Sequence, residues 1–191
     1  GGEWNVALDL HAFNRLMKSG LPIAIYPCAT VNGGSTAGQH NSYWQLPDLG
    51  FIKQLHPKLR RYLDFAFSKS ARYDFLLAMD KDDSTATLTS FYPRPHHVWE
   101  TALWINVAQR LLVQKKNGHY AIIPAAALSQ GDRIIPNDLK ECLIRVRPDG
   151  RFTYDLNKGS SNFKLYDRGN FTENEQALRE ALPALYQTFL K

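Results

Sequence analysis

This sequence has few cysteines, and it has no long apolar run and no targeting signal. Only two cysteines, Cys28 and Cys142, occur among its 191 residues, and their wide separation matches no metal-binding spacing. No run approaches the roughly 18 apolar residues that a membrane-spanning helix needs, and the first residues do not form a signal peptide. We therefore expect a soluble protein with no membrane partner. We also expect a buried thiol at Cys28, while the compartment stays unspecified.

The signatures of several common enzyme classes are missing as well. The sequence has no GxSxG nucleophile motif, no HExxH metal motif, no phosphate-binding loop and no GxGxxG at a strand–helix junction. Asp80, Asp82 and Asp83 form an acidic turn, but it lacks the glycine and the distal glutamate of an EF-hand calcium loop. The residues by themselves indicate no more than a polar pocket built from loops.

The basic residues, which give a net charge of +5 and a pI of about 9.2, are scattered along the chain. The densest groups are Lys58, Arg60 and Arg61 and the neighbours Lys115 and Lys116, and none accompanies a recognised nucleic-acid-binding motif. Solvated surface charge explains such groups, so we expect no nucleic-acid partner. A module that binds a polyanionic partner through this surface stays open as an alternative.

Apolar spacing and turn residues predict an α/β protein. Residues 7–19 place apolar side chains at helical intervals, with Asp9 as the N-terminal cap and Gly20 as the stop. The apolar run 22–29 follows directly, which indicates a helix leading into a buried, parallel strand. We therefore predict an open, mostly parallel sheet with flanking helices.

The rest of the chain alternates in the same way. Pro47 and Pro57 suit the first turns of helices in the segment 47–79. Further predicted elements are a helix at 101–112, a strand at 119–128, a hairpin at 141–156 that turns at Pro148, Asp149 and Gly150, a strand at 163–169 and an amphipathic helix at 173–190. No internal repeat divides the chain, so we predict a single α/β unit over residues 1–191.

Three segments combine polar side chains with aromatic rings. The first is Glu3, Trp4 and Asn5. A carboxylate and an amide two residues apart point to the same side of an extended chain, and together they suit the hydroxyls of a sugar. A helix-capping turn explains the same spacing equally well.

The second segment is the glycine-rich loop 30–42, which directly follows the predicted strand 22–29. In open α/β sheets, ligands bind outside the carboxyl ends of the strands. The polar residues of the loop and the rings after it are Asn32, Gln39, His40, Asn41, Tyr43 and Trp44. Amides, an imidazole and aromatic rings suit a cover over a polar ligand, and a mobile surface loop is the alternative.

The third segment contains His96, His97, Trp99 and Glu100, just before the helix predicted at 101–112. A histidine titrates close to neutral pH and is suited to act as a general acid or base. The carboxylate of Glu100 is the kind of oxygen ligand that a hard cation requires. An incidental pair of histidines before a helix is the alternative.

Four segments resemble the nucleoside hydrolases, the inosine–uridine-preferring nucleoside N-ribohydrolase family. The opening GGEWNVALDLHAFNRLMKSGLPIAIYP resembles the middle of that family, where a Glu-x-Asn segment leads a helix, a turn and a strand. VWETALWINVAQ, ALSQGDRIIP and NFKLYDRGNFTENEQALREALPALYQTFL are similar to later segments, the last to the closing strand and helix. The resemblance implies that residues 1–191 are the C-terminal portion of a larger domain of this fold.

The resemblance also implies roles for particular residues. Glu3 and Asn5 would bind the ribose, and Glu100 would stand at the position of an aspartate that binds calcium in the family. Trp99 occupies the position of a histidine proposed to protonate the leaving base, so that role passes to His97, His96 or His40. The aspartate-rich motif that supplies most calcium ligands in the family is absent from these 191 residues.

These observations lead to one hypothesis and one main alternative. We expect a hydrolase of the N-glycosidic bond of ribonucleosides or a related ribosyl compound, with calcium as the cofactor implied by the family. Stacking on the base would come from Trp4, Tyr43, Trp44 or Trp99, and Asn41 would contact the ligand. The alternative is a catalytically silent member that binds a nucleoside or sugar. A homo-oligomer is also possible, because half a sheet would leave an unpaired edge.

Overall fold

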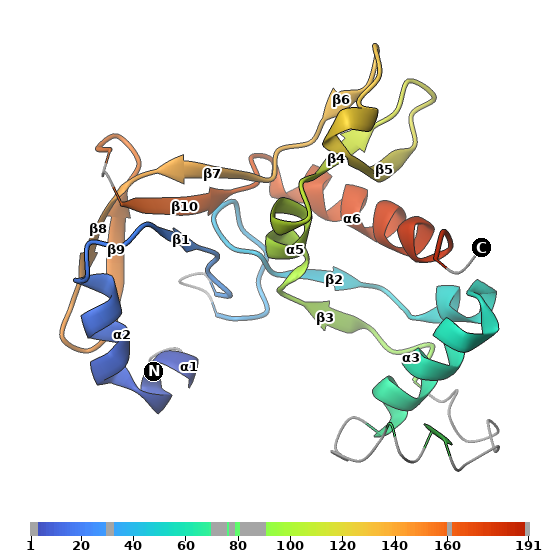
Figure 1. Cartoon of the computed structure of the whole chain (residues 1–191), viewed down its shortest axis with the longest axis horizontal. Helices are drawn as coiled ribbons and strands as arrows, with labels where there is room; N and C mark the ends of the chain where they lie inside the picture. The colour runs from blue at the N-terminus through green and yellow to red at the C-terminus, as the bar shows by residue number, and fades with distance from the viewer. Residues whose placement is uncertain are drawn as a thin grey trace.

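The protein is a mixed α/β structure with several small sheets (Figure 1). The computed structural model describes residues 4–29, 33–69, 76, 79–80, 91–159 and 162–189. The helices are α1 (Trp4–Leu8), α2 (Leu10–Met17), α3 (Pro57–Lys69), α5 (Thr101–Val107) and α6 (Phe171–Tyr186), with 3-10 helices η1 (Gly50–Gln54) and η2 (Ala125–Ala127). The strands are β1 (Ile23–Ile25), β2 (Trp44–Leu46), β3 (His96–Val98), β4 (Arg110–Gln114), β5 (Tyr120–Pro124), β6 (Arg133–Ile134), β7 (Asp138–Glu141), β8 (Leu143–Val146), β9 (Phe152–Asp155) and β10 (Phe163–Asp167).

The strands form four separate sheets, in the orders β1-β10-β7, β2-β3, β5-β4-β6 and β8-β9. Among the described strands, β1 and β10 make the one parallel pairing, and every other pairing is antiparallel. The α/β class is therefore confirmed, but the expectation of a mostly parallel sheet is wrong for this part of the chain. Short turns join β4 to β5 and β8 to β9, and such turns allow only antiparallel neighbours.

The cap and the stop predicted for the first helix are confirmed, although that helix, α2, spans Leu10–Met17 and not 7–19. The Asp9 carboxylate accepts a hydrogen bond of 2.8 Å from the Ala12 N–H and so caps α2. Gly20, after the helix, has φ +76°, a conformation that residues with a side chain rarely adopt. Strand β1 ends at Ile25, so Cys28 lies beyond it and is exposed. The expectation of a buried Cys28 is therefore wrong.

A smaller core lies between α2 and the sheet β1-β10-β7. Its buried members are Met17, Cys142, Ile144, Phe163 and Leu165. The adjoining β8–β9 hairpin confirms the turn predicted at Pro148–Gly150. Gly150 is required there, because its φ is +79° and an added Cβ would lie 2.6 Å from Cγ1 of Val6. The turn therefore packs closely against the N-terminal helices.

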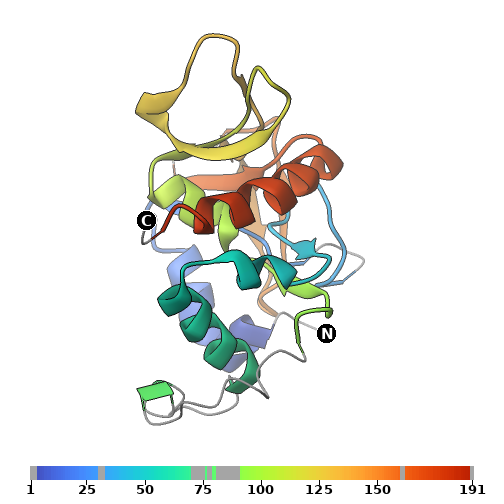
Figure 2. The same ribbon diagram turned by 90° about the vertical axis from the view of Figure 1, so that its right-hand side faces the viewer.

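The larger core surrounds the middle of α6, which lies between the β5-β4-β6 sheet and α3 (Figure 2). Ala177, Leu178 and Ala181 face this core from the helix. The helix predicted at 101–112 ends early, at Val107, and residues 110–114 form β4 instead. Leu112 and Val113 are almost completely buried in that strand, so the pairing with β5 overrides the helical spacing of the sequence.

Pro57 begins α3, as predicted, whereas the helical turn after Pro47 starts only at Gly50. Within the described residues, no helix has both the length and the apolar character to cross a bilayer.

Candidate functional site

The candidate site is built on the two-stranded ribbon of β2 and β3. The strands pair in the order Trp44–Val98, Gln45–His97 and Leu46–His96. Because side chains alternate along a strand, Trp44 and Val98 face the larger core while His97 faces the opposite side. Tyr43 directly precedes β2 and Trp99 directly follows β3, and both side chains lie on the same side of the ribbon as His97. Pairing therefore joins two sequence segments that lie far apart in the chain.

Tyr43, His97 and Trp99 form an aromatic–imidazole cluster. The Tyr43 and His97 rings stack with centroids 5.8 Å apart, and the His97 and Trp99 rings stack at 6.1 Å. The Tyr43 hydroxyl lies 2.9 Å from Nδ1 of His97. The Trp99 indole N–H donates a 2.9 Å hydrogen bond to the carbonyl of Gly34, in the glycine-rich loop. All three rings are thus held in place, and His97 is the exposed member.

Tyr43 occupies one of the two ring nitrogens of His97. Burial raises the pKa of Tyr43, the Glu175 carboxylate raises it further, and Arg179 partly offsets this effect. Tyr43 is therefore a neutral phenol near pH 7, and its hydroxyl can donate to Nδ1 of His97 or accept from it, as the tautomer of the imidazole requires. Nε2 is the ring nitrogen that Tyr43 does not contact.

His96 lies on the other face of the ribbon and is separated from the cluster. It is half-buried, and its ring meets the Phe67 ring edge-on at 4.7 Å. Burial lowers the pKa of His96, neighbouring His97 lowers it further, and Glu100 acts in the opposite direction. His96 therefore stays neutral near pH 7, which favours a packing role over proton transfer.

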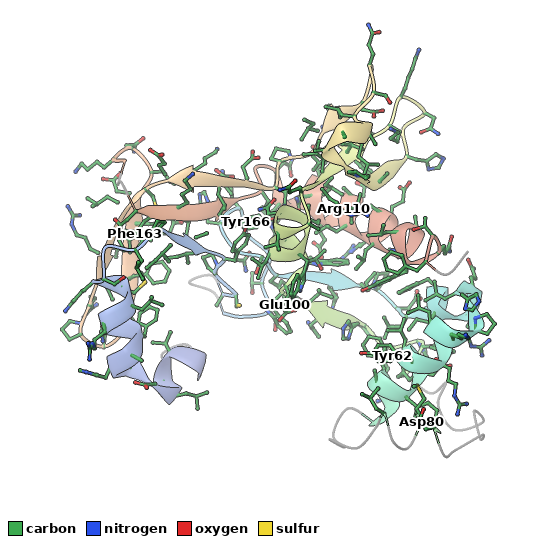
Figure 3. The ribbon with its side chains drawn as sticks, viewed as in Figure 1. Tyr62, Asp80, Glu100, Arg110, Phe163 and Tyr166 are labelled. Carbon is green, nitrogen blue, oxygen red and sulfur yellow. The ribbon has the colours of Figure 1, made fainter. Side chains whose placement is uncertain are left out.

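Glu100 lies at the junction of β3 and α5, with an exposed side chain (Figure 3). One of its carboxylate oxygens accepts a 3.3 Å hydrogen bond from the Trp99 backbone N–H. Within the described ranges, no three side chains of histidine, cysteine, aspartate or glutamate come together to hold a metal ion. The described residues by themselves therefore do not fit a calcium ion at Glu100, which would require several oxygen ligands.

Gln39 and His40 of the glycine-rich loop lie against the carboxyl end of β10, where Tyr166 is located (Figure 3). His40 Nδ1 lies 3.3 Å from the carbonyl of Tyr166, and its ring meets the Tyr154 ring edge-on at 5.4 Å. Gln39 donates a 3.2 Å hydrogen bond to Asp167. This part of the loop thus lies beside the end of the parallel pair β1–β10. Within the residues that the structure describes, no hydrogen bond or ring contact joins His40 to the aromatic–imidazole cluster.

Two residues predicted to bind substrate are structural instead. Trp44 is completely buried, and its indole N–H donates a 3.1 Å hydrogen bond to the Thr101 hydroxyl. Asn41 is 1% exposed, and its side-chain amide bonds to Thr36, Gly38 and Arg168. Neither side chain is accessible to a ligand in this structure, because the strand pairing and the loop fold turn both inward.

The segment Glu3–Asn5 gives no site geometry. Glu3 and Asn32 lie outside the described residues, and so do Asp82 and Asp83 of the acidic turn. Trp4 and Asn5 are described only as the first residues of α1. Their roles in binding a sugar remain predictions from the sequence.

Comparison with known proteins adds no family to this geometry. No protein-family model matches the chain, and neither does any curated protein or solved structure. The likeness to the nucleoside hydrolases therefore rests on the short segments quoted above, and the function is argued from the site itself.

The residues at the end of β10 that contact the glycine-rich loop were not predicted from the sequence. Tyr166, Asp167 and Arg168 are all buried at the end of β10, although two of them are charged. Lys140 lies 2.7 Å from the Asp167 carboxylate, and the Gly169 N–H donates to the same side chain at 2.7 Å. A charged pair directly after an apolar strand was the only signal in the sequence, and it does not distinguish a buried pair from a solvated one.

Proposed function

We propose that this chain is part of a hydrolase that cleaves the N-glycosidic bond of ribonucleosides or of a related ribosyl compound. The observation that supports this proposal is the aromatic–imidazole cluster, in which an exposed histidine packs against two aromatic rings that also contact each other. Tyr43 is buried and supports the cluster, whereas a flat base can stack on the half-buried Trp99 ring. The imidazole of His97 is then placed to exchange a proton with a nitrogen of that base. The resemblance of four segments to the nucleoside hydrolases points in the same direction.

In this proposal the two rings and the histidine have separate tasks. Trp99 offers only its ring face, since its N–H is bonded to Gly34. His97 presents Nε2 to the ligand, because Nδ1 is bonded to the Tyr43 hydroxyl. When His97 is protonated, the Tyr43 oxygen accepts from Nδ1 and the Nε2 proton is free to transfer, because a hydroxyl both donates and accepts.

The chemical step then follows from the charge that develops on the leaving group. The bond between C1′ of the ribose and the nitrogen of the base breaks as the oxygen of a water molecule bonds to C1′. Nε2 of protonated His97 gives its proton to the departing base, and the sugar passes through an oxocarbenium-like state. The attacking water loses one proton to solvent as its oxygen becomes the C1′ hydroxyl, and a proton from solvent restores protonated His97. A positioned general acid of this kind contributes on the order of 10²- to 10⁴-fold in rate.

The sugar side of the site rests on the resemblance alone. Glu3 and Asn5 would orient the ribose hydroxyls, and Glu100 would contribute one oxygen ligand to a cation. Because the described residues do not complete a calcium site, no step is assigned to calcium.

The decisive experiment measures ribose release by the purified full-length protein from a broad panel of purine and pyrimidine nucleosides, with calcium present. We expect release by the wild-type protein and a loss of about 10²-fold or more in His97→Gln, since the general acid is removed. His11→Gln is the matched control, because His11 is an exposed histidine on α2, far along the chain from the cluster. No release from any nucleoside would refute the hydrolase.

The second candidate is a silent protein that binds a nucleoside or sugar without cleaving it. It is favoured by Trp99, which stands where a proton donor is expected from the resemblance but has its indole N–H bonded to the carbonyl of Gly34. Calorimetric titration with the same nucleosides separates the two candidates. Binding that depends on Trp99 without ribose release identifies the silent protein.

A further inference from the structure

The glycine-rich loop is attached to the end of β10 by a set of hydrogen bonds. The Arg168 backbone N–H donates to the carbonyl of Gln39 at 3.1 Å, and the Arg168 Nε donates to the carbonyl of Gly38 at 2.9 Å. Its Nη2 donates to Oδ1 of Asn41 at 3.2 Å. One residue therefore contacts three positions of the loop.

Arg168 is unusual because its side chain is completely buried and its partners are neutral. Its relative exposure is 0%, and both acceptors are amide oxygens. Within the described part of the chain, Nη1 has no hydrogen-bond partner. Burial of a guanidinium with incomplete hydrogen bonding costs free energy, so stability alone does not explain an arginine at this position.

The same loop also bonds to one member of the aromatic–imidazole cluster and leads directly into another. Gly34, near its start, accepts the indole N–H of Trp99, and Tyr43 follows it directly. Asn41 joins its own end of the loop to the middle, because its Nδ2 donates to the carbonyl of Thr36 at 2.9 Å while its Oδ1 accepts from Gly38 and Arg168. Displacement of the loop would therefore move both the partner of Trp99 and the partner of His97.

We infer that Arg168 is a positioning residue for the aromatic–imidazole cluster. Its planar guanidinium contacts Gly38 and Asn41 at the same time, and so it sets the distance of the loop from β10. The loop in turn places Tyr43 against His97 and Gly34 against Trp99. The role of Arg168 in catalysis rests on the proposed function, but its effect on the loop does not.

The test uses 5-fluorotryptophan labelling of the whole chain and ¹⁹F NMR without any substrate. The protein has four tryptophans, and single Trp→Phe variants assign their resonances. In Arg168→Gln we expect the Trp99 resonance to shift or broaden while that of Trp104, which is 63% exposed on α5, stays unchanged. Arg168→Lys should restore the signal only in part, because an ammonium group cannot span both acceptors.

Hydrogen exchange gives a second readout of the loop. The Ser42 N–H donates to the carbonyl of Pro27 at 2.8 Å, and we expect its exchange to accelerate by about tenfold or more in Arg168→Gln. Backbone amides of the β4–β5 pair serve as the internal reference. The matched control is Arg145→Gln, because Arg145 is an exposed arginine of β8 and should leave both signals as in the wild type.

Asn41→Ala protects the test against loss of the fold. If Arg168→Gln unfolds, the resonance of buried Trp44 also changes, and Asn41→Ala then decides, because it removes an acceptor of Arg168 from the loop. An unchanged Trp99 resonance in a folded variant overturns the inference. If the protein releases no ribose but the loop signals change as expected, the proposed function fails and the positioning role stands. If the protein releases ribose but the loop signals stay unchanged, the proposed function stands and the positioning role of Arg168 fails.

Discussion

The Tyr43 hydroxyl lies 2.9 Å from Nδ1 of His97, although 54 positions separate the two residues in the chain. Because burial raises the pKa of Tyr43, and Glu175 raises it further, the phenol stays protonated where it meets Nδ1 of His97. Two strands that pair antiparallel thus hold an exposed imidazole by one of its two ring nitrogens.

Tyr43→Phe should remove the hydrogen bond to Nδ1 of His97 while keeping the ring. We expect the ratio of the two His97 tautomers in ¹⁵N NMR to change, and ribose release to fall. The free energy of unfolding should fall by about 0.5–1.5 kcal/mol, the net value of one hydrogen bond. Tyr154→Phe, on an exposed tyrosine of β9, is the control. An unchanged tautomer ratio in Tyr43→Phe would contradict the prediction.

Asp167 should make the stability depend on acid pH. Burial by itself raises the pKa of this carboxyl, but Lys140, the Gly169 N–H and Gln39 together hold it below its ordinary value. A carboxyl whose pKa is lower in the folded protein stabilises the fold above its unfolded pKa of about 3.9, and the stabilisation disappears as the pH falls through the folded value.

Urea unfolding from pH 7 down to pH 2 measures this effect. Asp167→Asn should weaken the loss of stability below about pH 4. It should also lower the free energy of unfolding at pH 7 by about 1–3 kcal/mol, because buried hydrogen bonds are lost. Asp138→Asn is the control, since Asp138 is an exposed aspartate on the neighbouring strand β7. Equal pH profiles of the two variants would contradict the prediction.

Trp44 and Trp99 should respond differently to the same substitution. Trp44 is 0% exposed, so Trp44→Ala opens a cavity in the larger core and should cost about 3–5 kcal/mol of stability. Trp99 is only half-buried on the other face, and Trp99→Ala should cost clearly less while weakening nucleoside binding. Chemical unfolding measures the stability of both variants, and calorimetric titration measures their nucleoside binding. Equal losses of stability in the two variants would contradict the prediction, because they would indicate that Trp99 packs in the core.

The local elements of this protein follow from its sequence. The cap at Asp9, the stop at Gly20, the start of α3 at Pro57 and the turn at Gly150 all rest on residues that restrict their own backbone or bond to a neighbouring amide. Such preferences act over a few residues, so one sequence is enough to read them. The α/β class was predictable for the same reason.

Strand pairing and burial were decided only by the tertiary structure. The helical spacing of 101–112 extends to Leu112, but Leu112 and Val113 are buried in β4 because β5 pairs with that strand. Trp44 and Trp99 are both tryptophans next to polar residues, and the ribbon turns one toward the core and the other toward the cluster. Arg168 is buried because the loop folds over it. These outcomes depend on contacts between distant segments, and local residue preferences do not contain that information.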